Sequence, residues 1–225
     1  MPFFKNRTEA GQRLAERLAS ERLVAPVVVL ALPRGGVPVA AEVARRLAAP
    51  LDLLLVRKIG APWQRELAVA AVVDGDAPEV VVDEGLSAYA GADRAYLERE
   101  TAAALAEIER RRQVYLQGRQ PLSLTGATVV LVDDGIATGT TVPVRAALKA
   151  VRRRGAAWIV LAVPVAPHDT LMALRSQCDR IICLAEPQPF RAVGLHYLDF
   201  HQVEDVEVQA ALTAAAPVSR ADAAG

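Results

Sequence analysis

The chain has 225 residues, enough for one α/β domain with a small appendage or at most two compact units. Apolar residues make up 52% of the chain and aromatic residues only 4%, which predicts an aliphatic core. Its 26 basic and 26 acidic side chains give a formal net charge of zero. This balance argues against a nucleic-acid binder that relies on a large basic surface.

The sequence has neither a predicted membrane span nor an export signal. Its longest uncharged runs, near residues 23–33 and 155–167, are too short to cross a bilayer. The N-terminus is charged and lacks the apolar core of a signal peptide. Cys178 and Cys183 are the only cysteines, too few for a metal site, so both are expected to be buried thiols. We therefore expect a cytoplasmic protein.

The hydrophobic pattern predicts that helices and strands alternate along the chain. Helices are expected over residues 6–20, 36–47, 92–115, 140–153, 169–177 and 204–212. Strands are expected over residues 27–32, 51–56, 67–73, 79–82, 129–132, 158–163 and 180–184. This order predicts an α/β fold with a doubly wound, mostly parallel sheet flanked by helices. The strands at 67–73 and 79–82 are expected to form a hairpin or an edge extension.

The most informative stretch is residues 128–141, which read TVVLVDDGIATGTT. Its apolar run predicts a strand covered on both faces of a parallel sheet. Asp133 and Asp134 follow, and their carboxylates suit the vicinal hydroxyls of a sugar or a hydrated divalent cation. The next loop can aim backbone N–H groups, hydroxyls and a helix N-terminus at a phosphate. The residues of this loop are Gly135, Ile136, Ala137, Thr138, Gly139, Thr140 and Thr141.

Other phosphate loops fit this stretch less well. A Walker A loop places Lys after its last glycine, but here Thr140 follows Gly139. The chain also lacks the three-glycine frame of a dinucleotide-binding loop. The plain alternative is an ordinary turn followed by an ordinary helix cap. The buried strand and the two acids favour a site that grips a phosphate at one end and a diol at the other.

The stretch resembles the signature with which type I phosphoribosyltransferases bind phosphoribosyl pyrophosphate (PRPP). The resemblance implies that residues 138–141 hold the 5-phosphate of PRPP, and that Asp133 and Asp134 hold the ribose hydroxyls. It also implies Mg²⁺, held by these acids only indirectly, through PRPP or water. Family members that act on 6-oxopurines usually carry Asp where this chain has Ala137. Hypoxanthine and guanine are therefore less expected as acceptors, while adenine, orotate and uracil types tolerate the change.

A second loop, Pro33, Arg34, Gly35 and Gly36, closes the first predicted strand and opens a helix. Its glycines let backbone N–H groups approach a ligand closely, and the forked cation of Arg34 suits a phosphate. The resemblance implies that this is the pyrophosphate loop. Taken alone, the loop also fits a glycine-eased turn with a surface arginine. The sequence leaves open whether the loop contains a cis peptide bond.

A polar loop is expected over residues 57–66, after the second predicted strand. The family has a mobile loop here that closes over PRPP, so Lys58 is the preferred pyrophosphate contact and Arg57 the second. The alternative is a pair of solvated charges at a loop edge. Farther along, Phe190 or Tyr197 is a candidate to stack on the acceptor base, or else packs the last helix onto the body. The arginines of 110–112 fit either an anion-binding patch or a solvated helix end.

We expect one phosphoribosyltransferase domain over residues 1–225. Its core would span about 21–185 with a helical insertion at 92–116, followed by a small C-terminal hood at 186–212 and a flexible tail at 213–225. A homo-oligomer, most simply a dimer, is expected. The leading hypothesis is an enzyme of nucleotide metabolism that uses Asp133, Asp134, Lys58 and Arg34 in catalysis. One alternative is a PRPP-binding regulator without transferase activity, which would need a surface or domain that binds nucleic acid. The other is a hydrolase or phosphorylase that acts on ribose 5-phosphate compounds.

Overall fold

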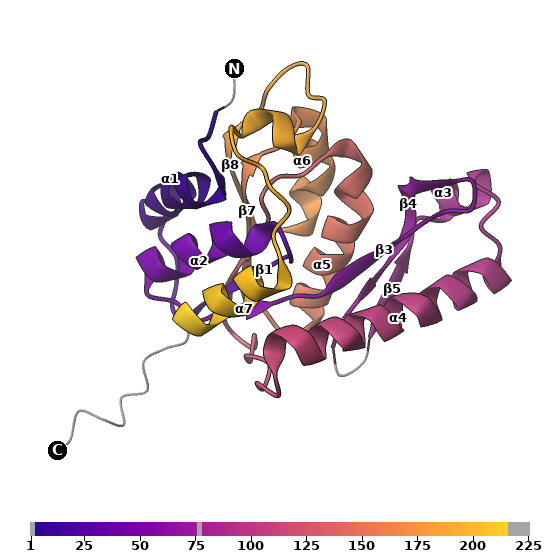
Figure 1. Ribbon diagram of the computed structural model, residues 1–225, viewed down its shortest axis with the longest axis horizontal. Helices are drawn as coiled ribbons and strands as arrows, with labels where there is room; N and C mark the ends of the chain where they lie inside the picture. The colour runs from indigo at the N-terminus through magenta and orange to yellow at the C-terminus, as the bar shows by residue number, and fades with distance from the viewer. Residues whose placement is uncertain (1–2, 76–77, 216–225) are drawn as a thin grey trace.

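The computed structural model describes residues 3–75 and 78–215 and has a five-stranded parallel sheet at its centre (Figure 1). The strand order is β2-β1-β6-β7-β8, and every pair of neighbours is parallel. The strands are β1 Val27–Ala31, β2 Leu51–Leu53, β6 Thr128–Val132, β7 Trp158–Val165 and β8 Arg180–Ala185. The predicted α/β fold with a doubly wound parallel sheet is confirmed.

Helices cover both faces of this sheet. One face packs against α1 (Arg7–Ala19), α2 (Gly36–Leu47) and α7 (Asp205–Ala214), through a core that includes Val130. The other face packs against α5 (Thr141–Arg153) and α6 (His168–Leu174), through a core that includes Leu131. Neighbouring residues of β6 thus enter opposite cores, as the alternation of side chains along a strand requires. Because both faces are buried, the strand is apolar from Val129 to Val132.

A second, antiparallel sheet extends from the core (Figure 1). Its strands are β3 (Val56–Ala61), β4 (Gln64–Val73) and β5 (Glu79–Val82). The pairing of β4 with β5 confirms the predicted hairpin, but the polar loop expected over 57–66 is wrong, because β3 and β4 occupy it. The second predicted strand also ends early, at Leu53. Leu54 still donates to the carbonyl of Ala31 in β1 at 3.0 Å, and the chain leaves the parallel sheet at Leu55, whose backbone N–H donates to Oδ1 of Asp74.

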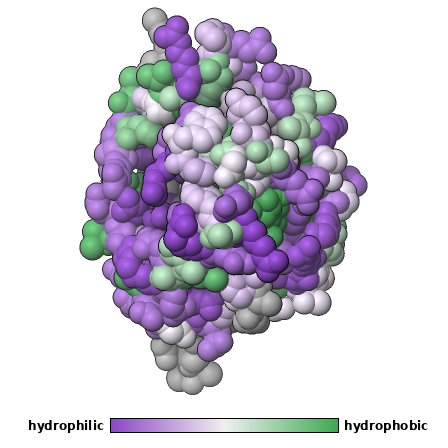
Figure 2. Space-filling view, turned by 90° about the vertical axis from the view of Figure 1, so that its right-hand side faces the viewer, coloured by the Kyte–Doolittle hydropathy of each residue, from purple (hydrophilic) through white to green (hydrophobic). Residues whose placement is uncertain are grey.

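The long helix α4 (Arg94–Leu116) lies along one face of this second sheet, after the short helix α3 (Glu84–Tyr89) (Figure 1). It matches the predicted helix to within two residues. Asp93 caps its N-terminus by accepting a hydrogen bond from the backbone N–H of Tyr96 at 2.8 Å. The side of the molecule on which α3 lies is mainly hydrophilic, with scattered hydrophobic areas (Figure 2).

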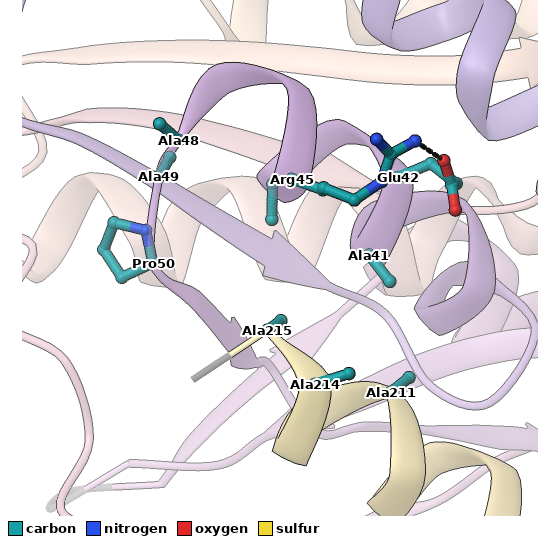
Figure 3. A pocket seen from close by; sticks show the side chains of 10 residues that line it. Ala41, Glu42, Arg45, Ala48, Ala49, Pro50, Ala211, Ala214 and Ala215 are labelled. Carbon is teal, nitrogen blue, oxygen red and sulfur yellow. Dashed lines mark hydrogen bonds and ion pairs between the residues drawn. The ribbon is translucent and has the colours of Figure 1, made fainter. Parts of the chain in front are cut away.

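Small residues dominate the contact between α2 and α7. A cavity of about 360 Å³ remains there and is lined largely by alanines of the two helices (Figure 3). None of the predicted site residues lines it. Both cysteines are half-buried, less than the full burial expected, and burial raises the pKa of each thiol to about 11. No helix within residues 3–75 and 78–215 combines the length and apolarity needed to cross a membrane.

The segment between β8 and α7 is largely irregular, as predicted, and contains the short 3-10 helix Val193–His196. It packs against the start of the chain, where Phe4 pairs with Tyr197 at a ring-centroid distance of 5.4 Å. Of the tail expected to be flexible, residues 213–215 end α7, and residues 216–225 lie outside the described part of the chain.

Candidate functional site

The loops after β1 and β6 lie side by side. These two strands are adjacent and parallel, with Ala31 opposite Val132. The pairing continues one residue farther, because the backbone N–H of Leu32 donates to the carbonyl of Val132 at 2.9 Å. The carboxyl ends of both strands therefore meet at one edge of the sheet, where ligands of doubly wound folds bind.

Two glycines allow these loops to touch. A Cβ placed on Gly35 would lie 2.6 Å from Cγ of Asp134 and closer still to one of its oxygens. A Cβ placed on Gly36 would lie 2.8 Å from the carbonyl oxygen of Val132. Both separations are shorter than real Cβ contacts, so neither position has room for a side chain. The peptide bond between Pro33 and Arg34 is cis.

Replacing Gly35 by Ala is expected to separate the two loops. The new methyl group would overlap the Asp134 carboxylate, so the carboxylate or the loop has to move. Overpacking of this kind costs about 1–3 kcal/mol, which unfolding in denaturant would measure. Gly85→Ala is the matched control, because a Cβ there would meet its nearest neighbour at 3.7 Å. Equal stability of the two variants would contradict the close approach described here.

Asp134 is held by an arginine that the sequence did not indicate. Nε of Arg7 lies 2.7 Å from Oδ2 of Asp134, and both side chains are largely buried. Arg7 also donates to the carbonyl of His201 at 2.7 Å and stacks over the ring of Phe200 at 3.8 Å. Burial raises the pKa of Asp134, and the charge of Arg7 opposes that rise. The clamp fixes where the Asp134 carboxylate lies.

Asp133 has no such clamp. Its Oδ1 accepts a hydrogen bond from the backbone N–H of Asp134 at 2.8 Å, but none of the ion pairs within the described residues includes it. Burial, and then the neighbouring charge of Asp134, raise the pKa of Asp133 well above its usual range. Asp133 lies beside the loop after β1, since a Cβ placed on Gly36 would lie 3.2 Å from its Oδ1. A half-buried carboxylate with a perturbed pKa is a candidate for a functional site.

The loop that precedes α5 gathers backbone amides and threonine hydroxyls at the start of a helix. Thr138–Thr140 make one 3-10 turn, and the first of these residues is exposed. The hydroxyl of Thr140 accepts from the backbone N–H of Ala137 at 3.1 Å, and that of Thr141 donates to the carbonyl of Thr138 at 2.9 Å. Hydroxyls and amides thus lie at the N-terminal end of a 13-residue helix, a position that favours an anion.

Arg57 and Lys58 do not share one loop that faces one crevice. They are consecutive residues of β3, so their side chains leave opposite faces of the strand. Lys58 lies opposite Ala71, which belongs to the core under α5. Arg57 lies opposite Val72, which belongs to the core under α4. The expectation that both cations point toward the same crevice from a mobile loop is therefore wrong.

Lys58 belongs to a hairpin that lies close to the loop preceding α5. Its Nζ lies 2.6 Å from Oε2 of Glu66, across the β3–β4 hairpin. A Cβ placed on Gly139 would lie 3.6 Å from the backbone oxygen of Glu66, so the hairpin and the loop that precedes α5 are neighbours. The cation of Arg34 is partnered elsewhere, 3.4 Å from Oδ1 of Asp205 in α7.

Tyr197 supports the site and does not present a ring to a base. It is 4% exposed, and its hydroxyl donates to the carbonyl of Asp134 at 2.5 Å. The predicted stacking role is wrong for this residue, because the buried ring packs against Phe4 and Phe200. Phe190 is partly buried and pairs with His196 at 5.2 Å.

The crevice itself has a volume of about 400 Å³. It is lined by the loop after β1, by Asp134 and by a C-terminal stretch that the sequence analysis did not single out. The lining residues are Arg7, Arg34, Gly35, Asp134, Phe200, His201, Gln202 and Val203. An arginine at the start of the first helix and a loop in the last fifth of the chain carry no local motif, so only the folded chain brings them to the acids.

The chain matches a family described as the phosphoribosyl transferase domain, over residues 6–199. This match covers most of the chain, and the chain belongs to that family. The fold is the one that the type I signature led us to expect.

Individual relatives agree. Two curated proteins of Mycobacterium tuberculosis, each named "Putative phosphoribosyl transferase", are 45% identical over 212 residues, which cover 94% of this chain and 47% of the relative. The chain thus spans about half the length of these relatives. The protein TT1426 from Thermus thermophilus, known from a crystal structure, is 45% identical, with a TM-score of 0.80, over 96% of this chain and 100% of that one. AQ2163 of Aquifex aeolicus, 11% identical with a TM-score of 0.52 over 92% and 85%, shares the fold.

Proposed function

We propose that the protein transfers the 5-phosphoribosyl group of PRPP to a nitrogenous base or a related small nucleophile and releases pyrophosphate. The observation that carries the proposal is the contact between the loops after β1 and β6. This contact puts an acid pair between a phosphate cradle and a glycine-rich anion loop. PRPP offers a phosphate, a diol and a diphosphate in that same order. The match to the phosphoribosyl transferase family supports the choice.

Each part of the site has a proposed role. Thr138–Thr141 and the N-terminus of α5 hold the 5-phosphate, and Asp133 with Asp134 holds the ribose hydroxyls and places negative charge near the ring. Breaking the bond from C1 to pyrophosphate leaves positive charge on the ring and negative charge on the leaving group. The first is stabilised by the acids. The second is stabilised by Arg34, Lys58 and the amides of the Gly35–Gly36 loop.

Mg²⁺ is part of the proposal. No group of three or more acidic, histidine or cysteine side chains that could hold a metal ion occurs among the described residues. Because Arg7 already pairs with Asp134, Asp133 is the carboxylate left to face a hydrated cation. The donor set therefore fits an ion held chiefly by the phosphates of PRPP, with the protein binding through water. When bound, the ion supplies charge neutralisation of the diphosphate.

Other features stay within the proposal. The stretch 186–212 is proposed as a hood, because residues 200–203 line the crevice and Arg7 binds the carbonyl of His201. The proposed acceptor is a base whose transfer requires no carboxylate at the position of Ala137, such as adenine, orotate or uracil. We also propose that the protein forms a single domain, is located in the cytoplasm and assembles as a dimer.

The test is pyrophosphate release from PRPP and Mg²⁺ with a panel of bases. We expect release that depends on one base and yields the corresponding nucleotide. Release without any base would identify a hydrolase. Binding of PRPP without release would identify a regulator, the alternative that the fold leaves open. The Lys58→Gln variant is expected to slow release at least about tenfold, because a charge-assisted contact worth about 1.5–3 kcal/mol is lost.

A further inference from the structure

A second cavity, with a volume of about 530 Å³, lies away from the crevice. Residues 120–125, which lead into the amino end of β6, form part of its wall, whereas the acid pair follows the carboxyl end of that strand. Arg153 and Arg154, at the end of α5, form another part. The 13 residues of α5 span about 20 Å, and the helix begins at the threonine loop, so the cavity and that loop lie at opposite ends of it. No described residue lines both the cavity and the crevice.

Two arginines of the cavity wall share one buried carboxylate. Asp74 follows β4, and its side chain is 6% exposed. Nη2 of Arg112 lies 3.5 Å from Oδ2 of Asp74, and Nη2 of Arg154 lies 3.4 Å from Oδ1. The backbone N–H of Leu55 also donates to Oδ1, at 3.2 Å. A carboxylate fixed by the backbone therefore holds the two guanidinium groups on the wall.

Both guanidinium groups have more donors than acceptors around them. A guanidinium group has N–H donors on all three of its nitrogens, and its hydrogen bonds to carboxylates are usually about 2.7–2.9 Å long. Among the described residues Arg112 makes only the 3.5 Å contact with Asp74, and its buried Nε has no acceptor. Arg154 uses a single nitrogen, which donates to the backbone carbonyl and to Oδ1 of Asp74. This part of the wall is short of acceptors.

The other acids of the wall do not supply them. Glu79 binds Arg153 at 2.7 Å, and the two oxygens of Asp52 accept backbone N–H groups at 2.8 and 2.9 Å. Asp74 therefore faces two cations, which leaves one positive charge in excess. Burial raises the pKa of Asp74 even though the charges of both arginines oppose the rise, so this carboxylate is itself costly to keep ionised. An anion bound in the cavity would supply the missing acceptors and balance the charge.

The rest of the wall suits a small molecule that carries such an anion. Exposed polar side chains, those of Gln120, Ser123 and Thr125, add amide and hydroxyl donors. Leu53 and Leu116 add apolar surface. The volume lies within the range of about 300–1,000 Å³ that is usual for small-molecule sites. A phosphate group matches the wall, because its oxygens can accept from the forks of two arginines at once.

We propose that this cavity is a second anion site, which binds the phosphate group of a small molecule. Arg112 and Arg154 are its binding residues, and Asp74 is the residue that positions them. The site shares no residue with the crevice, so the proposal does not depend on the proposed function.

Labelling of arginine side chains with phenylglyoxal, located by mass spectrometry, tests the site in the wild-type protein. Inorganic phosphate is expected to lower the labelling of Arg112 and Arg154 several-fold relative to potassium chloride at the same ionic strength. Arg34 reports on the crevice in the same experiment. Arg94, which is 92% exposed and pairs with Glu98, is the control and should be labelled equally in both salts. Ribose 5-phosphate is the second probe: stronger protection than by phosphate identifies a phosphoester as the ligand, and equal protection identifies free phosphate.

A variant links the protection to the two arginines. Arg112→Gln is expected to raise the phosphate concentration that protects Arg154 about tenfold or more, the loss usual for one hydrogen bond between charged groups. Protection of Arg34 should not change. Arg112→Lys, which keeps the charge, should be intermediate, and Arg94→Gln should behave as the wild type does.

Three results would overturn the site. In the first, phosphate protects Arg112 and Arg154 no more than potassium chloride does. In the second, it protects Arg34 alone, which places the anion only in the crevice. In the third, Arg112→Gln leaves the protection of Arg154 unchanged. Protection of the two cavity arginines in a protein that neither binds nor cleaves PRPP would keep the site and remove the proposed function.

Discussion

Replacing Asp133 by Asn is expected to weaken PRPP binding strongly and, at the same time, to make the ligand-free protein more stable. Asp133 is half-buried beside a second acid, and both burial and the charge of Asp134 raise its pKa. An amide of the same shape removes this repulsion while keeping an oxygen for the backbone N–H of Asp134. A gain of about 1 kcal/mol is expected in unfolding free energy at pH 7.

The loss of binding follows from the same charge. Hydrogen bonds from ribose hydroxyls to a carboxylate are worth about 1.5–3 kcal/mol each, so Kd for PRPP should rise about 10- to 100-fold. Calorimetry with Mg²⁺ gives Kd, and chemical unfolding gives the stability. Asp169→Asn is the control, because Asp169 is exposed at the start of α6 and does not line the crevice. An Asp133→Asn variant that keeps wild-type affinity would remove the acid pair from the proposed site.

The stability gain of Asp133→Asn over the wild type is expected to increase with pH. The pKa of Asp133 is raised in the folded state, so the unfolded chain loses this proton first as pH rises. Stability is therefore unaffected by this group below the ordinary carboxyl range and falls as pH climbs from there through the raised folded value. The difference between Asp133→Asn and wild type should be near zero at the acid end and grow across that window. A difference that shrinks with rising pH would contradict the repulsion.

The sheet and the acid pair were predictable because their information is local. A continuous apolar run marks a strand that is buried on both faces, and the strand 128–132 shows this pattern without interruption. The residues that follow such a strand lie at the carboxyl edge of a parallel sheet, whatever the order of the strands in the sheet. Gly35 and Gly36 were recognisable in the same way, as two consecutive glycines after a predicted strand. The structure shows why they are needed, because a Cβ at either position would overlap the loop after β6.

The β3–β4 hairpin was not predictable in this way. Residues 57–66 contain charges and one glycine, and the register of β3 shifts at Gly60, so neither strand shows a clean alternation. The pairing of β3 is fixed by the apolar stretch at the end of β4. A polar segment paired to a buried strand looks like a loop when read alone, which is why Arg57 and Lys58 were expected in one crevice.

Arg7 shows a different limit. Its neighbours in sequence make it the first residue of an amphipathic helix, and nothing local distinguishes it from Arg13 or Arg17. Its role depends on Asp134, 127 residues away, and on the carbonyl of His201. A buried arginine is recognised by its partner, and the partner is known only after the chain has folded.

Replacing Arg7 by Ala is expected to give the largest loss of stability of any substitution in the site. The Arg7–Asp134 pair is largely buried, and breaking such a pair leaves an uncompensated charge that costs about 3–5 kcal/mol. The carbonyl of His201 and the ring of Phe200 lose their partner as well. Unfolding free energy at pH 7 measures the effect.

The controls for this variant distinguish the buried pair from the loss of an arginine as such. Arg13→Ala removes a cation over the ring of Phe4, at 4.8 Å, but its ion pair with Glu9 is exposed, so a change below about 1 kcal/mol is expected. Without Arg7 the pKa of Asp134 rises further, because the charge that opposed the rise is gone. The penalty of Arg7→Ala should therefore be smaller at pH 5 than at pH 8, since protonation of Asp134 relieves the unpaired charge. The double variant Arg7→Ala, Asp134→Asn should recover at pH 8 part of the unfolding free energy that Arg7→Ala loses. A double variant no more stable than Arg7→Ala alone would show that the arginine acts through His201 and Phe200 instead.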